Sequence, residues 1–369
     1  MPSSVTTRGL RKQCRIPRGH ALSLATAQTL LLRGGVVGAQ NPIFVVGCPR
    51  SGTSLLRDLL RAHPHLSFPS ASFFIPSLYK AYGDPRDEAQ VRRLVGIILR
   101  IDWVRRWGLE LAPSEFASCR SYREIVSCLF EAWARKEGKR RWGDKTPDNV
   151  TEIPTILEIF PSAKIIHIYR DGRDVALSWL KAGYRVHNLF TAATRWKQWV
   201  SAGRAAGARL PASYLEVRYE TLLSEPESTL REICSFLGEP YYPGMLMPNY
   251  LPRRDYPPWI GIREATSVYH SEILRSNSGK WKTAMSPSDR ILFESVAGDL
   301  LRELCYETGA PTRTISLSEQ RWWQIHNRGK RLLWQLNTKY KRRWVPSLFI
   351  LQWATIRSRL RHAHSSARG

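Results

Sequence analysis

The chain has 369 residues, 43% of them hydrophobic, and a formal net charge of +25, so it can bury one large core and is not intrinsically disordered. Its 6 cysteines lie far apart without a C-x-x-C pair, which argues against a zinc site or a dense disulfide framework and fits a reducing compartment best. No apolar run reaches the roughly 18 residues of a membrane-spanning helix.

Most of the positive charge lies at the two ends of the chain. Residues 1–40 contain six Lys or Arg and no acid, and the residues after Glu319 contain twelve and again no acid. We therefore expect a basic arm over residues 1–40, either disordered or a cleaved targeting peptide. Residues 41–310 are predicted to form one folded domain, and residues 311–369 a basic, tryptophan-rich helical tail.

Strands and helices alternate along the middle of the chain. Residues 43–47 form an apolar run that predicts a buried strand, and residues 53–63 place leucines on one helical face. This alternation is typical of a central parallel sheet with helices on both faces, an α/β fold of three α/β/α layers. Residues 241–259, rich in proline and tyrosine, predict a long irregular loop. Further helices are predicted over residues 88–107, 122–137, 150–160, 173–182, 192–206, 221–223, 227–237 and 287–305, and further strands over residues 163–169 and 214–219.

The segment GCPRSGTS, residues 47–54, follows the first predicted strand and leads into the first helix. Its glycines have the G-x-x-x-x-G spacing of a phosphate-binding loop, which makes the fold one of P-loop type. Backbone N–H groups of such a loop, together with the first helical turn, favour an anion. Thr53 stands where a nucleotide triphosphatase has lysine, and Arg50 offers a forked, permanently charged donor inside the loop.

This loop resembles the 5'-phosphosulfate loop of sulfotransferases, which use 3'-phosphoadenosine 5'-phosphosulfate (PAPS) as donor. Residues 168–179, IYRDGRDVALSW, are similar to the family's 3'-phosphate element, in which an arginine at the strand end and a serine eight residues later grip that phosphate. The resemblance extends over residues 41–305 and is greatest to the tyrosylprotein-like and bacterial carbohydrate-type branches. It implies donor contacts from Pro49, Arg50, Ser51, Gly52, Thr53, Ser54, Arg170 and Ser178.

Three further segments are similar to the same family. In VRYE, Tyr219 would approach the adenine, although a core tyrosine with a satisfied hydroxyl explains it as well. In SGKW, Ser278 and Lys280 would close over the 3'-phosphate. In WGDKTP, Lys145 would neutralise charge on the departing oxygen, against the alternative of a solvated surface lysine. The resemblance thus makes Arg50 and Lys145 the candidate catalytic residues, and no metal is expected.

The acceptor side departs from the family pattern. The tyrosylprotein-like branch carries a glutamate some seven residues after the His-Pro that ends the first helix, and Ala71 occupies that place here. His63, His65 and Asp144 are the nearest alternative bases by sequence. The acceptor could instead be an amine or an already acidic hydroxyl, or the protein could bind the nucleotide without turnover.

The C-terminal segment, residues 320–369, combines its twelve cations with five tryptophans. This composition suits the surface of an anionic membrane, and equally a helix packed on the core with its charges solvated; nucleic acid is the less favoured partner. We predict a PAPS-dependent sulfotransferase that acts on a hydroxyl or amine of a glycan, lipid-linked or small-molecule acceptor, located in the cytoplasm with peripheral membrane association. A P-loop small-molecule kinase and an inactive, membrane-associated nucleotide-binding protein are the rival interpretations.

Overall fold

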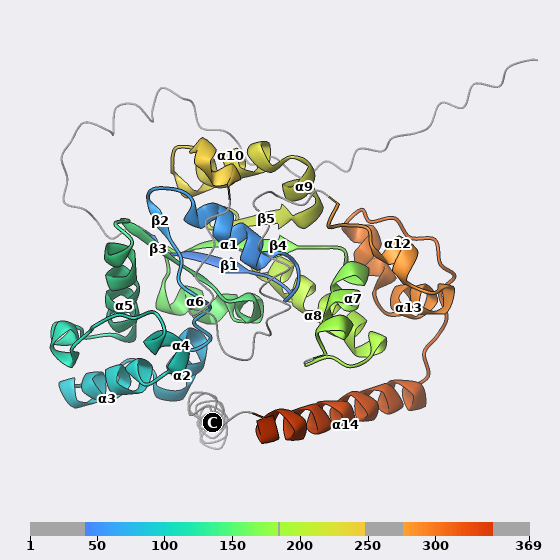
Figure 1. The fold of residues 1–369 in the computed structure, drawn as a ribbon, viewed down its shortest axis with the longest axis horizontal. Helices are drawn as coiled ribbons and strands as arrows, with labels where there is room; N and C mark the ends of the chain where they lie inside the picture. The colour runs from blue at the N-terminus through green and yellow to red at the C-terminus, as the bar shows by residue number, and fades with distance from the viewer. Residues whose placement is uncertain (1–40, 184, 248–275, 342–369) are drawn as a thin grey trace, which may run out of the picture.

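The computed structural model describes residues 41–183, 185–247 and 276–341 (Figure 1). The expected basic arm, most of the expected loop over residues 241–259 and the last part of the tail lie outside the described residues. The described chain forms one sheet of parallel strands in the order β2-β3-β1-β4-β5. The strands are β1 (Ile43–Val46), β2 (Leu66–Ser67), β3 (Arg141–Lys145), β4 (Lys164–Tyr169) and β5 (Tyr214–Arg218).

Alternate side chains of the central strand enter the cores on opposite faces of the sheet. Ile43 and Val45 belong to one buried cluster, together with leucines of α1 (Thr53–Arg61) and α10 (Pro226–Leu237). Phe44 and Val46 belong to another. Every residue of this strand is fully buried, as expected for a parallel strand covered on both faces. The three-layer α/β/α fold of P-loop type is thereby confirmed.

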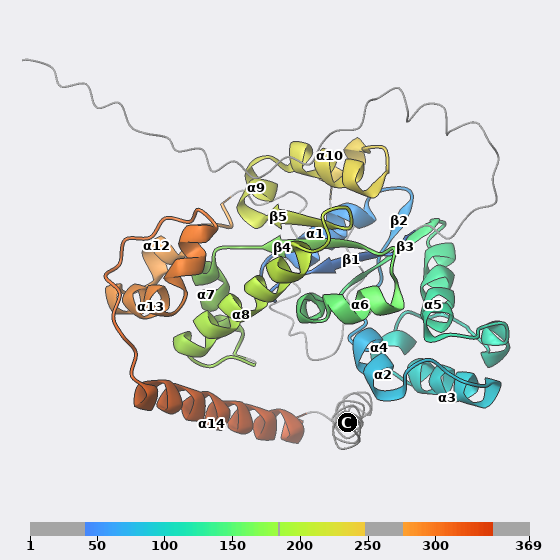
Figure 2. The same ribbon diagram turned by 180° about the vertical axis from the view of Figure 1, so that it is seen from behind.

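Helices from the rest of the chain complete the two outer layers (Figures 1 and 2). One layer contains α1 and α10 with α9 (Tyr219–Ser224) between β5 and α10. On the opposite face lie α5 (Tyr122–Lys136) and α6 (Ile153–Ile159). A third buried cluster joins α7 (Gly172–Ala182), α8 (Leu189–Gly207) and α13 (Pro287–Glu303) beside the sheet. The smaller helices are α2 (Ile75–Tyr82) and α12 (Trp281–Ala284).

Several predicted boundaries are corrected by the structure. The helix expected over residues 88–107 is two helices, α3 (Glu88–Leu99) and α4 (Asp102–Arg105). The chain turns between them because Trp103 and Trp107 are buried and their indole N–H groups donate to Ser72 O at 2.6 Å and Ser70 Oγ at 2.9 Å. Strands β2 and β3 and helix α2 were not predicted.

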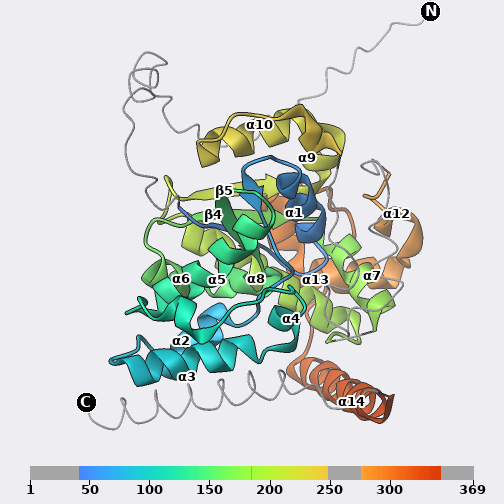
Figure 3. The same ribbon diagram turned by 60° about the vertical axis from the view of Figure 1, so that its left-hand side comes forward.

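The basic tail forms a helix of 25 residues, α14 (Leu317–Lys341), which stands apart from the sheet in Figure 3. It contacts the start of α8: His187 N donates to Asn327 Oδ1 at 2.8 Å, and Asn188 Nδ2 donates to Trp323 O at 2.8 Å. Among the described residues, none of the helices has the length and hydrophobicity needed to cross a bilayer.

Gly143 in β3 allows a close contact that a side chain would prevent. A Cβ there would lie 2.2 Å from the ring of Phe68, whereas a Cβ on Gly96 in α3 would meet nothing within 4 Å. We expect Gly143→Ala to lower the free energy of unfolding by about 1–3 kcal/mol through overpacking. As a control, Gly96→Ala should raise it by about 0.5–1 kcal/mol, since it removes only backbone freedom. Urea titrations that found the two variants alike would contradict this account of β3.

Candidate functional site

The carboxyl ends of the parallel strands meet at one edge of the sheet, where α/β folds bind their ligands (Figure 1). The phosphate-binding loop follows β1, and Thr146 follows β3. Arg170 follows β4, and Tyr219 follows β5. Residues predicted from four separate motifs are therefore gathered on neighbouring strands.

The loop after β1 leaves the first turn of α1 open to an anion. Gly52 precedes α1 with φ 95°, no side chain caps the helix, and its first turn contains no acid. Arg50 also has a positive φ, 76°, which is rare for a residue with a side chain and is found mainly where function requires it. Ser51 Oγ is buried and has no hydrogen-bond partner among the described residues. Uncompensated helix N–H groups and an unpartnered hydroxyl form a cradle suited to phosphate or sulfate.

A hydrogen bond joins the loop to the second predicted motif. Arg50 Nε donates to Ser178 Oγ at 2.9 Å, although the two residues are 128 positions apart. Ser178 lies on α7, two turns after Arg170. The arginine of one motif and the serine of the other are thus neighbours, as two halves of a single anion site would be.

Arg170 lies between three groups. Its Nη2 donates to Asp174 Oδ2 at 3.1 Å and to Asn277 O at 2.8 Å. Its guanidinium lies 4.5 Å from the ring centroid of Tyr219. The side chain is buried, and Nε has no hydrogen-bond partner within the described part of the chain. A buried cation with an unpartnered donor is suited to an anionic ligand.

Asp174 connects this arginine to the C-terminal segment. Its carboxylate accepts from Gly279 N at 2.8 Å and from Trp281 N at 2.9 Å, in addition to Arg170. Sequence reasoning did not identify this role, because an acid in the first turn of a helix is explained by the helix dipole alone. The partners lie 105 and 107 positions away, and no local pattern marks them.

The segment held by Asp174 contains the two predicted 3'-phosphate donors. Ser278 is half-buried, and the side chain of Lys280 is exposed, with no hydrogen bond or ion pair to the site in the described structure. Their phosphate contacts stay a prediction. Trp281 is buried, and its ring lies 3.4 Å from the guanidinium carbon of Arg173, so it belongs to the core.

Tyr219 packs directly on the phosphate loop. A Cβ on Gly52 would lie 2.3 Å from its ring, and Asn277 Nδ2 donates to its hydroxyl at 2.7 Å. The ring is buried, which raises the pKa of the hydroxyl. This satisfied, buried tyrosine fits a core position, so its approach to an adenine stays a prediction.

Lys145 ends β3 beside the loop and is not a solvated surface lysine. Only 6% of it is exposed, and Nζ donates to Ser54 Oγ at 3.4 Å. Burial and the nearby Arg57 lower its pKa to about 7. The free protein therefore holds this amine near the balance between its charged and neutral forms, and a bound anion would favour the charged form.

Asp144 faces away from this lysine, because neighbouring strand residues point to opposite faces. Its carboxylate accepts from Ser72 N at 3.3 Å, Thr146 Oγ1 at 3.1 Å and Asn149 Nδ2 at 3.1 Å. Burial raises its pKa to about 6 despite these bonds. It therefore fixes the segment around Ala71, the place where the family pattern has glutamate.

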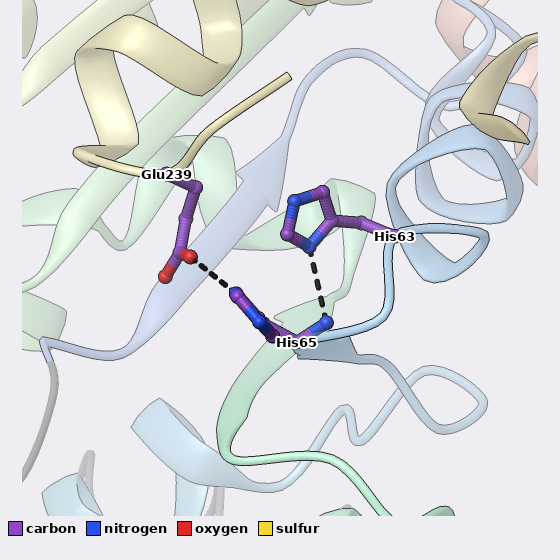
Figure 4. Close-up of side chains that lie close together, drawn as sticks. All are labelled: His63, His65 and Glu239. Atoms are coloured by element: carbon purple, nitrogen blue, oxygen red, sulfur yellow. Dashed lines mark hydrogen bonds and ion pairs between the residues drawn. The ribbon is translucent and has the colours of Figure 1, made fainter. Parts of the chain in front are cut away.

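His63 and His65 lie in a different cluster, with Glu239 (Figure 4). His65 N donates to His63 Nδ1 at 3.1 Å, and the other ring nitrogen of His63 then donates to Pro240 O at 2.9 Å. Burial lowers the pKa of His63. Both ring nitrogens of His63 are thus occupied by hydrogen bonds of a neutral imidazole.

This cluster is neither beside the loop nor well suited to a metal ion. Glu239 forms ion pairs with Arg140 and with Arg141, each at 3.2 Å, besides its contact with His65 at 2.9 Å. Two guanidinium groups would oppose a cation there. Arg141 begins β3 and Lys145 ends it, so the cluster lies about 13 Å from the loop along the strand. The two histidines, which are the nearest alternative bases by sequence, therefore do not lie beside the loop.

Comparison with known proteins gives one consistent family. Residues 42–243 match the model of the Sulfotransferase family. A Caenorhabditis briggsae protein named as a candidate protein-tyrosine sulfotransferase is 28% identical over 211 residues, 55% of this chain and 68% of that protein. The omega-hydroxy-beta-dihydromenaquinone-9 sulfotransferase Stf3 of Mycobacterium tuberculosis is 26% identical over 251 residues, 54% of this chain and 63% of its own length.

The fold is also found among solved structures. The sulfotransferase domain from the curacin biosynthetic pathway superposes with a TM-score of 0.52 at 24% identity. The match covers 73% of this chain and 99% of that domain. This similarity supports the arrangement of sheet and helices described above.

The lowered pKa of Lys145 makes stability depend on pH. Its pKa is about 7 in the folded protein against the usual 10.5, so between these values the unfolded chain binds the extra proton. The free energy of unfolding should therefore rise with pH in this window, by roughly 1 kcal/mol per unit, and Lys145→Met should lack this increment. Urea titrations of both proteins at pH 7 and pH 9 measure the difference. The same pH dependence in both would show that the amine is not buried as described.

Proposed function

Because the chain belongs to the sulfotransferase family, we propose that it transfers a sulfuryl group from PAPS to a hydroxyl-bearing acceptor. The observation that carries this proposal is the hydrogen bond of 2.9 Å from Arg50 to Ser178. It joins the loop that resembles a 5'-phosphosulfate site to the helix that resembles a 3'-phosphate site. A donor with phosphate groups at both ends requires these two sites to be neighbours.

The residues present fit such a donor. The open first turn of α1, the unpartnered Ser51 Oγ and the backbone N–H groups of Gly52, Thr53 and Ser54 would hold the 5' end. Arg170, whose Nε has no partner among the described residues, and Ser178 would hold the 3' end. The segment that Asp174 fixes, with Ser278 and Lys280, would close over the same phosphate.

The donor supplies an activated sulfuryl group, and the protein supplies positioning and charge. Sulfuryl transfer, like phosphoryl transfer, needs the acceptor oxygen, the sulfur and the leaving oxygen in line. Arg50 and Lys145 lie on the loop side, where they would stabilise negative charge that develops on the leaving oxygen. The protonated form of Lys145 is required for this role, and a nearby anion favours it.

The acceptor group that receives the sulfuryl group is proposed to be a hydroxyl. Relatives are named for protein tyrosine and for a hydroxylated menaquinone, and both are hydroxyl acceptors. Asp144 holds the segment of Ala71 through the hydrogen bond from Ser72 N, and its carboxylate also accepts from Thr146 Oγ1 and Asn149 Nδ2, which assigns it a structural role. We therefore propose an acceptor hydroxyl that loses its proton without a glutamate at position 71.

The donor site can be tested by calorimetric titration with 3'-phosphoadenosine 5'-phosphate and with ATP. We expect micromolar binding of the bisphosphate and much weaker binding of ATP, since Thr53 replaces the lysine that holds outer phosphates. Arg170→Ala should abolish binding of the bisphosphate, whereas Arg231→Ala, an exposed arginine on α10, should not change it. Preference for ATP would favour the kinase interpretation, and tight bisphosphate binding without turnover on any acceptor would favour a binding protein.

Lys145 can be tested separately from donor binding. We expect Lys145→Met to lower kcat by about 10²- to 10³-fold, because it removes charge stabilisation at the leaving oxygen. Lys139→Met is the matched control: Lys139 is half-buried, with a pKa that burial lowers to about 8, but it donates to Leu66 O at the other end of the sheet. Steady-state assays with PAPS should show near-normal kcat for the control. Equal losses in both variants would mean that the effect is structural.

A further inference from the structure

In the described part of the chain, helix α14 contacts the domain through one face, which carries Trp323 and Asn327. Asn327 is 5% exposed and accepts from His187 N, and Trp323 contacts the third buried cluster and accepts from Asn188 through its carbonyl. These residues lie four positions apart, so they occupy one side of the helix. The other side faces away from the domain.

That outer side is apolar and exposed. Trp322 is 55% exposed, Ile325 67%, Leu332 56% and Leu333 62%. Their spacing of three, seven and one residues places them on a single stripe opposite Trp323 and Asn327. The other large hydrophobic side chains that are exposed in the described chain, Tyr242, Met247 and Leu317, do not lie on this stripe. A contiguous apolar stripe of this kind marks an interaction surface.

The stripe is bordered by positive charge. Arg321 and Arg328 lie on one side of it and Lys330 on the other, and all three are exposed. No Asp or Glu occurs anywhere after Glu319. The ring of Trp322 stacks on His326 at 5.4 Å with 18° between planes, which keeps the indole at the border between the stripe and its polar flank.

We propose that the outer face of α14 docks on an anionic membrane surface. A helix with leucine, isoleucine and tryptophan on one face and cations beside them lies in the plane of the interface, with its apolar stripe below the headgroups. The indole would sit at headgroup depth, and the flanking cations would contact anionic lipids. The helix needs no change of structure for this, since the stripe already faces outwards.

Charge favours an anionic membrane over three other possible partners of the stripe, namely residues 342–369 of the same chain, a second copy of the chain and a nucleic acid. Residues 342–369 contain six arginines and no acid, so they complement an anionic surface and are repelled by the flanks of α14. A second copy of the chain would bring the same cations together. A nucleic acid would contact the cations but would leave the leucines and the isoleucine in water.

Vesicle co-sedimentation of the full chain tests the proposal. Vesicles of phosphatidylcholine and phosphatidylglycerol in equal parts should bind the protein, and vesicles of phosphatidylcholine alone should bind it much less. The double substitution Ile325→Gln and Leu333→Gln should weaken binding about tenfold or more, and Arg328→Gln about fivefold. Leu317→Gln is the matched control, because Leu317 is 72% exposed on the same helix but lies off the stripe. It should bind like the wild type.

Each other result would overturn the proposal. Equal binding to neutral vesicles, or binding that the double variant retains, would show that the stripe is not the docking surface. A dimer in analytical ultracentrifugation that only the double variant disrupts would assign the stripe to a second copy. Binding to RNA but not to vesicles would assign the cations to a nucleic acid. Titration of each variant with 3'-phosphoadenosine 5'-phosphate separates these outcomes from a failure of the donor site.

Discussion

The arrangement of the site depends on one buried carboxylate. Asp174 accepts from the Arg170 side chain and from the backbone N–H groups of Gly279 and Trp281. It therefore holds a segment from the end of the domain against the end of β4. Without these bonds two backbone donors would lose their partners, and the guanidinium would lose its nearest counter-charge. Through Asp174, residues 277–281, Arg170 and the first turn of α7 are therefore held together as one hydrogen-bonded unit.

Buried charge is concentrated around the phosphate loop. Lys145 is 6% exposed, and Arg57 and Asp58 on α1 are fully buried and paired at 2.6 Å. Burial raises the pKa of Asp58 even with this partner. Such groups are destabilising unless a partner compensates them, and they are common where a fold binds a charged ligand. The loop therefore has the electrostatics of an anion site before any ligand is bound.

The sequence predicted the loop and the elements that carry it better than it predicted their surroundings. β1 and β4 are predicted by their apolar runs, α1 by its amphipathic pattern and β5 by its alternating pattern. β3 was missed because RWGDK contains a glycine and three charges, which are buried here by contacts with distant residues. Contacts between distant residues also place Lys145 beside Ser54 in the loop and join Asp144 to Ser72. Another such contact, from His63 to Pro240 O, holds that histidine near the start of β3, away from the loop.

Gly52 and Tyr219 illustrate how two motifs far apart in the chain constrain each other. The ring of the tyrosine occupies the space that a Cβ on the glycine would need, at 2.3 Å. A side chain at position 52 would therefore need a smaller residue at position 219 and would also have to adopt the left-handed backbone of Gly52, at φ 95°. Tyr219 can be replaced by a smaller residue without a change at Gly52, so redesign of the site for another donor has to begin at position 219.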